Sequence, residues 1–145
     1  MAASVPQTLK NHARYQPLFH FFIMPVLLIA FFASIIMAVR SPGLHSIWTI
    51  LVCAAVLGIA FLTRINALKV QDRVIRLEER LRLSTLLSEP LRSRIGELSE
   101  GQLIALRFAP DTEVTSLVEQ TLAKRMEGKE IKQTIKNWRA DDWRV

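Results

Sequence analysis

The sequence is poor in residues that cross-link chains or carry out chemistry, and two long stretches of it contain no charged residue. Cys53 is the only cysteine among 145 residues, so an intramolecular disulfide is excluded and nothing requires an oxidising compartment. No glycine-rich phosphate loop is present. Acidic residues are absent from residues 1–71, which carry five Lys or Arg. The formal net charge of +6 therefore arises mostly from the first half of the chain.

The two charge-free stretches, residues 18–39 and 44–63, are predominantly apolar and are separated only by an Arg-Ser-Pro-Gly sequence at residues 40–43. At ~1.5 Å per residue they would reach roughly 33 and 30 Å as helices, the thickness of a bilayer's hydrocarbon core. Proline and glycine between them favour a turn. The pattern predicts a transmembrane helical hairpin.

Positive residues flank this hairpin unevenly, which predicts its orientation. The connection contains only Arg40, whereas the other side carries several cations, and retained Lys and Arg concentrate on the cytoplasmic side. We therefore expect a multi-pass membrane protein with both termini in the cytoplasm. A cleaved signal peptide is less favoured, because the first apolar stretch is too long and lacks an A-x-A cleavage site. The flanking cations are Lys10, Arg14, Arg64, Lys69, Arg73 and Arg76.

Two residues in the first stretch need explanation. Pro25 cannot donate a backbone hydrogen bond to Phe21, so a kink is expected nearby. His20 lies about one turn inside the stretch, among phenylalanines. It is interpreted as an anchor at the membrane boundary, with an axial ligand to haem or chlorophyll as the alternative.

Small residues recur at four-residue spacing in both stretches, and this favours close helix packing. They either close the hairpin on itself or dock onto another membrane subunit. The absence of charged residues from both stretches disfavours transport or ion conduction by this chain alone. The small residues are Ala30, Ser34 and Ala38 in the first stretch, and Ala54 and Gly58 in the second.

After Thr63 no proline or glycine interrupts the sequence before Leu87, so one helix of some 40 residues is expected, with residues 64–87 as its juxtamembrane part. Asp72 with Arg76 and Glu78 with Arg82 are expected to pair across one helical turn. An apolar seam with alternating spacings of four and three predicts contact with a partner or with the chain's own tail. The seam consists of Val70, Val74, Leu77 and Leu81.

Residues 88–145 predict a cytoplasmic domain of short amphipathic helices, because apolar residues recur there at helical spacing and no alternating strand pattern is present. One helix is expected after Pro90. A second follows a capping box at Ser99 and Gln102, and a third has Asp111 as its N-cap and ends near Gly128. The last helix would place Ile131, Ile135 and Trp138 together. The fold class expected is therefore all-α.

Basic residues surround Trp138 in the C-terminal part of this domain. They predict either a basic amphipathic helix on anionic lipid or an ordinary solvated face. Binding to nucleic acid is not expected, because residues 72–145 are almost neutral and a possible helix-turn-helix over residues 103–126 carries acids on its second helix. The basic residues are Lys129, Lys132, Lys136 and Arg139.

Catalytic residues are not expected. The pairs Glu78–Glu79 and Asp141–Asp142 are adjacent in sequence and so point in different directions on a helix. No acid–base pair therefore has the geometry for catalysis. Apart from the alternative for His20, we expect no cofactor and no metal.

Three segments resemble a family of small, uncharacterised bacterial membrane proteins with two transmembrane helices and a cytoplasmic helical tail. They are the polar run before the first apolar stretch, with Asn11, His12, Arg14 and Tyr15, the sequence QLIALRFA at residues 102–109, and IKNWRAD at residues 135–141. The resemblance covers nearly the whole chain. It implies the two-span plan and a bacterial origin, and it assigns no role to any residue.

These observations together predict a cytoplasmic arm (residues 1–17), a hairpin (18–63), a juxtamembrane helix (64–87) and a helical domain (88–145). The function expected is that of a non-enzymatic auxiliary or scaffold subunit of an inner-membrane complex. Its partners would be membrane subunits and lipid, with a homo-oligomer possible. The alternatives are a stand-alone anchor that recruits a soluble regulatory partner, and a haem- or chlorophyll-holding subunit of an electron-transfer or photosynthetic complex.

Overall fold

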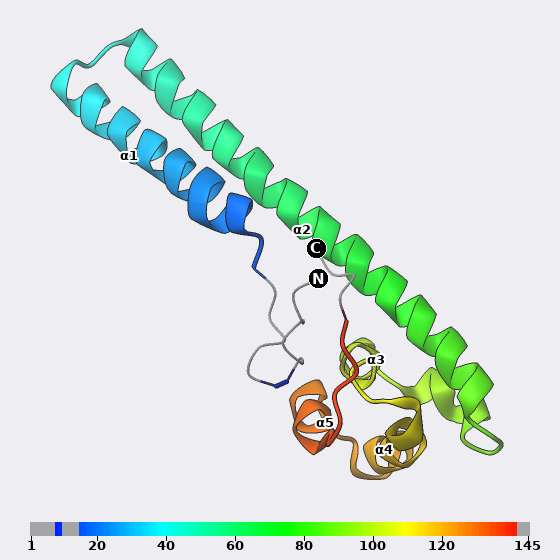
Figure 1. The fold of residues 1–145 in the computed structure, drawn as a ribbon. Helices are drawn as coiled ribbons and strands as arrows, with labels where there is room; N and C mark the ends of the chain where they lie inside the picture. Colours follow the sequence, from blue (N-terminus) through cyan, green and yellow to red (C-terminus); the bar gives the residue numbers. More distant parts are fainter. Residues whose placement is uncertain (1–7, 10–14, 142–145) are drawn as a thin grey trace. The chain divides into compact units, whose positions relative to one another are not determined.

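A computed structural model describes residues 8–9 and 15–141, and the regular structure in these residues is entirely helical (Figure 1). The described chain falls into two compact units, residues 15–69 and residues 70–141, the latter together with residues 8–9. The all-α prediction is confirmed. Lys10, His12 and Arg14, which entered the sequence predictions, lie outside the described residues.

The first unit begins with a π-helical segment, η1 (Leu18–Ile23), which runs directly into α1 (Met24–Arg40). The backbone N–H of Met24 donates to the carbonyl of Phe19, five residues back, instead of four. Pro25 follows at once, and its ring and missing N–H disturb the turn before it. The irregularity expected near Pro25 therefore takes the form of a wider helical turn.

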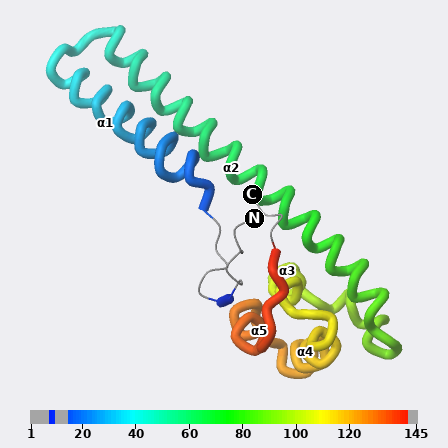
Figure 2. Tube along the Cα trace, in the orientation of Figure 1, coloured from blue at the N-terminus to red at the C-terminus, as the bar shows by residue number. Residues whose placement is uncertain are grey.

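Helix α1 ends in a short turn, and α2 (Leu44–Leu86) begins after Gly43. The N–H of Ser41 donates to Met37 O at 2.8 Å, and the hydroxyl of Ser46 donates to Ser41 O at 2.7 Å. These bonds satisfy backbone groups that the helix ends leave open. Figures 1 and 2 show the first part of α2 running back beside α1, as the hairpin prediction requires.

Both helices of the first unit expose large apolar side chains. Ile29 is 68% exposed, Met37 67% and Leu44 84%. Segments Leu18–Arg40 and Leu44–Leu86, of 23 and 43 residues, are long and apolar enough to cross a membrane by length and composition. A soluble monomer rarely exposes so much contiguous apolar surface.

Helix α2 continues without a break from its apolar part into its charged part. Its 43 residues confirm the prediction of one helix of some 40 residues. The charged part belongs to the second unit and contributes the fully buried Leu83 to the core of that unit, and Leu87, the residue directly after the helix, lies in the same core.

Four short helices complete the second unit: η2 (Arg92–Glu97), a 3-10 helix, then α3 (Glu100–Leu106), α4 (Asp111–Lys124) and α5 (Gly128–Thr134). Their apolar faces meet around one core, which includes the buried residues Leu98, Leu103, Ala105, Leu106, Phe108, Ala109, Val114, Leu117, Val118, Met126, Ile131 and Ile135.

The ends of these helices agree with the sequence predictions only in part. The capping box is confirmed: Ser99 Oγ accepts from the N–H of Gln102, and the Gln102 side chain accepts from the N–H of Ser99. The N-cap prediction for Asp111 is wrong, because Pro110 occupies the N-cap and Asp111 is the first residue of α4. The predicted end near Gly128 is also wrong: α4 ends at Lys124, and Arg125 adopts the left-handed conformation (φ 51°).

Trp138 lies outside α5, contrary to the prediction of a helix that continues through it. The chain after Thr134 leaves the helix and crosses the core, where the Trp138 and Phe108 rings lie 4.8 Å apart. The N–H of Arg139 donates to Phe108 O at 2.8 Å. Ile131 and Ile135 are buried as expected. The three apolar residues therefore share the core without sharing a helix.

Helix α5 lies close to the backbone of α3 at Gly128, which is next to Gly101. A Cβ placed on Gly128 would lie 2.9 Å from the backbone oxygen of Gly101 and 3.6 Å from Ala105 Cβ. A Cβ on Gly101 would meet nothing within 4 Å. Only Gly128 is therefore required by the packing of the two helices.

Gly128→Ala should destabilise the second unit by about 1–3 kcal/mol, because the backbone of α3 has to move away from the new methyl group. Gly101→Ala is the matched control and should be neutral or stabilising by up to about 1 kcal/mol, since alanine favours helix. Urea unfolding of the full-length protein in detergent micelles, followed by circular dichroism, measures both. Equal stability of the two variants would contradict the prediction.

Candidate functional site

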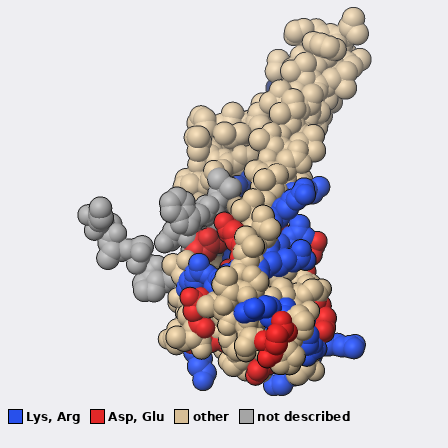
Figure 3. Space-filling model, turned by 90° about the vertical axis from the view of Figure 1, so that its right-hand side faces the viewer, with Lys and Arg blue, Asp and Glu red and all other residues tan. Residues whose placement is uncertain are grey.

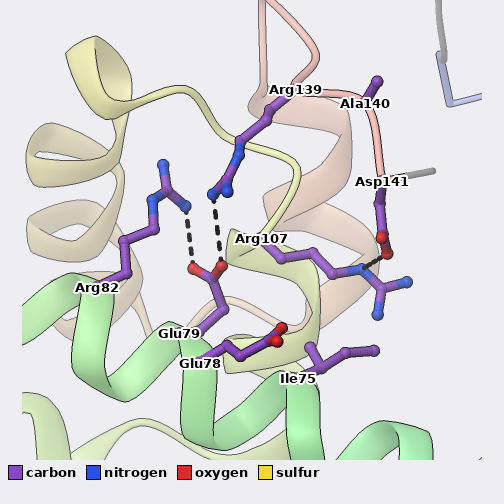
Figure 4. A pocket seen from close by; sticks show the side chains of 8 residues that line it. All are labelled: Ile75, Glu78, Glu79, Arg82, Arg107, Arg139, Ala140 and Asp141. Atoms are coloured by element: carbon purple, nitrogen blue, oxygen red, sulfur yellow. Dashed lines mark hydrogen bonds and ion pairs between the residues drawn. The ribbon is translucent and has the colours of Figure 1, made fainter. Parts of the chain in front are cut away.

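Charged side chains of the second unit gather in a pocket of about 460 Å³. The pocket is formed by α2, by the chain around Arg107 and by the C-terminal segment, residues 135–141 (Figure 4). Glu79 and Arg107 are only 5% and 6% exposed. The lining residues are Ile75, Glu78, Glu79, Arg82, Arg107, Arg139, Ala140 and Asp141.

Arg82 makes the largest set of polar contacts in this pocket. One amino group of its guanidinium donates to Glu79 Oε2 at 3.0 Å. Its Nε and its other amino group donate to Asp111 Oδ1 at 2.9 and 2.6 Å, and that amino group also donates to Ala109 O at 2.7 Å. Arg82 thereby joins α2 to the start of α4 and to the connection before it.

Glu79 lies between two arginines. Besides Arg82, the guanidinium of Arg139 lies 3.7 Å from Glu79 Oε1. Desolvation by burial raises the pKa of the Glu79 carboxyl above its ordinary value, and the surrounding guanidinium groups only partly offset that effect. Its ionised form therefore depends on both arginines.

Arg107 forms the second buried ion pair of the pocket, with its Nε 3.2 Å from Asp141 Oδ2. The Arg107 guanidinium carbon also lies 4.4 Å from the centroid of the Phe108 ring, a cation–π distance. Three arginines and three carboxylates line the pocket, so its formal charge is balanced. This arrangement holds the C-terminal segment against α2.

Glu113 on α4 provides another attachment for the same segment. Its carboxylate accepts hydrogen bonds from the N–H groups of Lys136 and Asn137 and from the Asn137 amide, at 3.1, 3.2 and 2.6 Å. Partial desolvation acts to raise the pKa of Glu113, but these bonds and the Lys136 charge outweigh it and lower the pKa.

The ion pairs predicted along α2 do not form as expected. Arg82 bonds to Glu79 and Asp111 instead of Glu78. Arg76 forms an ion pair with Glu100 of α3, and its Nε donates to the backbone oxygen of Asp72. Sequence spacing identified the helix but not these partners, because Asp111 and Glu100 come from segments far away in the sequence and Glu79 lies three residues from Arg82 instead of four.

The apolar seam of α2 is exposed in the structure. Val70, Val74, Leu77 and Leu81 are 63%, 47%, 60% and 60% exposed. The second unit packs against a different face of α2, which contains the buried residues Ile75, Glu79 and Leu83. Residues 88–141, the part of the tail that the structure describes, therefore leave the seam uncovered.

The small residues of the first unit do not all lie in one contact. Ser34 is buried and its hydroxyl donates to Phe31 O at 2.6 Å. Ala38 is half-buried, whereas Ala30 and Ala54 are exposed. A Cβ on Gly58 would meet nothing within 4 Å. Their role in docking another subunit stays a prediction.

His20 lies within η1, with its ring edge-on to Tyr15 and Phe19 at 5.5 and 5.2 Å. Its Nδ1 is within hydrogen-bonding distance of both backbone atoms of Gln16, N at 3.2 Å and O at 2.9 Å. This setting suits an anchor, and the ligand alternative stays untested. Among residues 8–9 and 15–141, no group of three or more His, Cys, Asp or Glu could hold a metal ion.

The basic residues near the C-terminus do not form one amphipathic helix, because α5 ends at Thr134. Lys129 and Lys132 lie on α5, and the Lys132 ammonium is 5.6 Å from the Phe108 ring centroid. Lys136, Trp138 and Arg139 follow in the C-terminal segment, where Arg139 faces Glu79. Figure 3 shows positive and negative residues intermixed on this unit. Contact with lipid stays a prediction.

Over residues 1–145 the chain matches a protein family described as Family of unknown function (DUF6526). The chain belongs to this family. Neither a curated protein nor a solved structure matches the chain. The resemblance to an uncharacterised family that the sequence indicated is thus confirmed. In this chain, the architecture is a pair of long apolar helices followed by a small helical bundle.

Arg82→Ala should destabilise the second unit by about 3 kcal/mol, because it leaves the buried Glu79 carboxylate with only the more distant Arg139. Arg80→Ala is the matched control: Arg80 is exposed on the same helix, and its loss should change stability by no more than about 0.5 kcal/mol. Urea unfolding in micelles tests the pair. Similar midpoints for both variants would show that the Arg82 contacts do not support the fold.

Proposed function

We propose that this protein is a non-enzymatic scaffold subunit of a membrane protein complex. In this proposal residues 18–63 anchor the chain in the bilayer as a hairpin, and residues 70–141 form a helical module beside the membrane. The observation that carries the proposal is the exposure of apolar side chains along α1 and the first part of α2. Burying such surface in lipid or against other subunits removes it from water.

The internal chemistry of the module also supports a structural role. Glu79, Arg82, Arg107 and Asp141 are engaged in ion pairs with one another or with neighbours in the chain. Such pairs hold segments together and leave these groups committed to the fold. The proposal therefore places binding to partners on exposed surfaces instead of in the charged pocket.

A test of the proposal is gentle solubilisation of native membranes. The protein should resist extraction by alkaline carbonate and should migrate in mild detergent together with other integral membrane proteins. Recovery without detergent would contradict membrane anchoring. A lone species carrying only a soluble protein would favour the adaptor alternative, and visible absorbance of the purified protein would favour a pigment held by His20.

Two variants sharpen this test. Ala30→Leu places a large side chain on the exposed small-residue face of α1. Ile29→Leu is the control, because it replaces an exposed neighbouring side chain with an isomer of equal volume. If the small-residue face docks a subunit, Ala30→Leu should release that subunit and Ile29→Leu should not. Retention in both variants would exclude this face as the docking surface.

We also propose that the module and both termini lie in the cytoplasm of a bacterial cell, with Gly43 outside. In a Cys53→Ala background, Gly43→Cys should react with a membrane-impermeant thiol reagent in intact cells, because its side chain would meet nothing within 4 Å. Glu119→Cys, on the exposed surface of α4, should react only after lysis. The reverse pattern would overturn the orientation.

A further inference from the structure

Helix α2 has two opposed faces within the second unit. At about 100° per residue, the centre of the seam lies roughly 170° around the helix from the centre of the buried face. The buried face, with Ile75, Glu79 and Leu83, is covered by the chain's own bundle. The seam is left exposed by the same packing that buries the other face.

The seam has the spacing of a two-stranded coiled coil. Val74 and Leu81 take the first apolar position of successive heptads, and Val70 and Leu77 take the second. Valine at the first position followed by leucine at the second favours a parallel dimer, as in Val74 and Leu77. Ser84 occupies the next position, so the apolar seam ends at Leu81.

Charged residues flank the seam in a self-complementary pattern. Arg73 precedes the Val74 position and Glu78 follows the Leu77 position, five residues apart. In a parallel dimer these are the two positions that face each other across the interface, so each Arg73 would meet the Glu78 of the other copy. Both residues are exposed, and within the described part of the chain neither makes a hydrogen bond or an ion pair.

Membrane anchoring would stabilise a dimer whose seam is too short to hold two copies together in solution. Fewer than two heptads do not form a stable coiled coil in solution. Two copies inserted with the same topology would carry their α2 helices in the same direction, and confinement to one bilayer would raise their effective concentration. The parallel arrangement that the charges require is the one that a shared membrane would impose.

We propose that Val70, Val74, Leu77 and Leu81 form the interface of a parallel homodimer, with two Arg73–Glu78 pairs between the copies. The proposal rests on the membrane anchoring of the proposed function and deepens it by naming a second copy of this chain as the partner of the seam. The scaffold is then a two-fold assembly with one bundle on the outer face of each α2.

Disulfide cross-linking in native membranes tests the contact, using full-length protein with Cys53→Ala. Leu77→Cys lies within the seam, and Ser84→Cys continues its register without removing an apolar residue. Both should cross-link on mild oxidation, because equivalent second-position residues of a parallel dimer face each other. Glu119→Cys, exposed on α4, should not. Cross-linking at Glu119 as strong as at the seam, or none at either seam position, would overturn the proposal.

Charge exchange tests the pairing of identical chains. Arg73→Glu alone and Glu78→Arg alone each place like charges opposite one another, and each should weaken dimerisation about three- to tenfold. The double variant restores opposite charges and should recover dimerisation. Energy transfer between labelled copies in liposomes, at varied protein-to-lipid ratio, measures the change. A double variant as weak as either single variant would overturn the parallel register.

The outcomes separate this proposal from the scaffold function. A protein that stays in the membrane and migrates with other subunits, but shows no seam cross-links, retains the proposed function and loses the homodimer. A protein extracted by carbonate loses the anchoring on which both depend. Seam cross-links that persist in a preparation lacking other subunits support the homodimer as a contact that forms independently of the larger complex.

Discussion

The exclusion of water from the apolar helices is the constraint on which the rest of the structure depends. Leu44, 84% exposed, and Ile29, 68% exposed, cannot be stably presented to water in such numbers along two neighbouring helices. Residues 8–9 and 15–141 leave these side chains exposed, so the surrounding medium has to cover them. Lipid and the surfaces of other membrane subunits both meet that requirement.

The second unit differs from the first in burying charged side chains beside a small apolar core. Four short helices and part of α2 enclose few apolar residues, and small domains of this kind are marginally stable. Glu79 is buried beside them and is held by Arg82 and Arg139. A buried carboxylate without a partner destabilises a fold. We infer that the ion pairs of Glu79 therefore specify which segments of the chain pack together.

Features that depend on local sequence were predictable, and features that depend on distant contacts were not. The length of α2 followed from the absence of helix breakers, and the Ser99 capping box followed from a three-residue spacing. Asp111 was a suitable N-cap by residue type, but Arg82, 29 residues earlier, takes its carboxylate. Trp138 had helical spacing from Ile131, yet its ring is held by Phe108 outside any helix. The charged pocket was missed for the same reason.

The return of the C-terminal segment over the core sets an order of events during synthesis. Trp138 and Arg139 complete contacts with Phe108 and Glu79, which are made much earlier. A growing chain therefore exposes an open core until these late residues emerge. The apolar hairpin is produced well before them, so the insertion into lipid that we propose would precede closure of the module. The proposed anchoring and the folding of the second unit would in this way be separated in time by the position of two residues in the sequence.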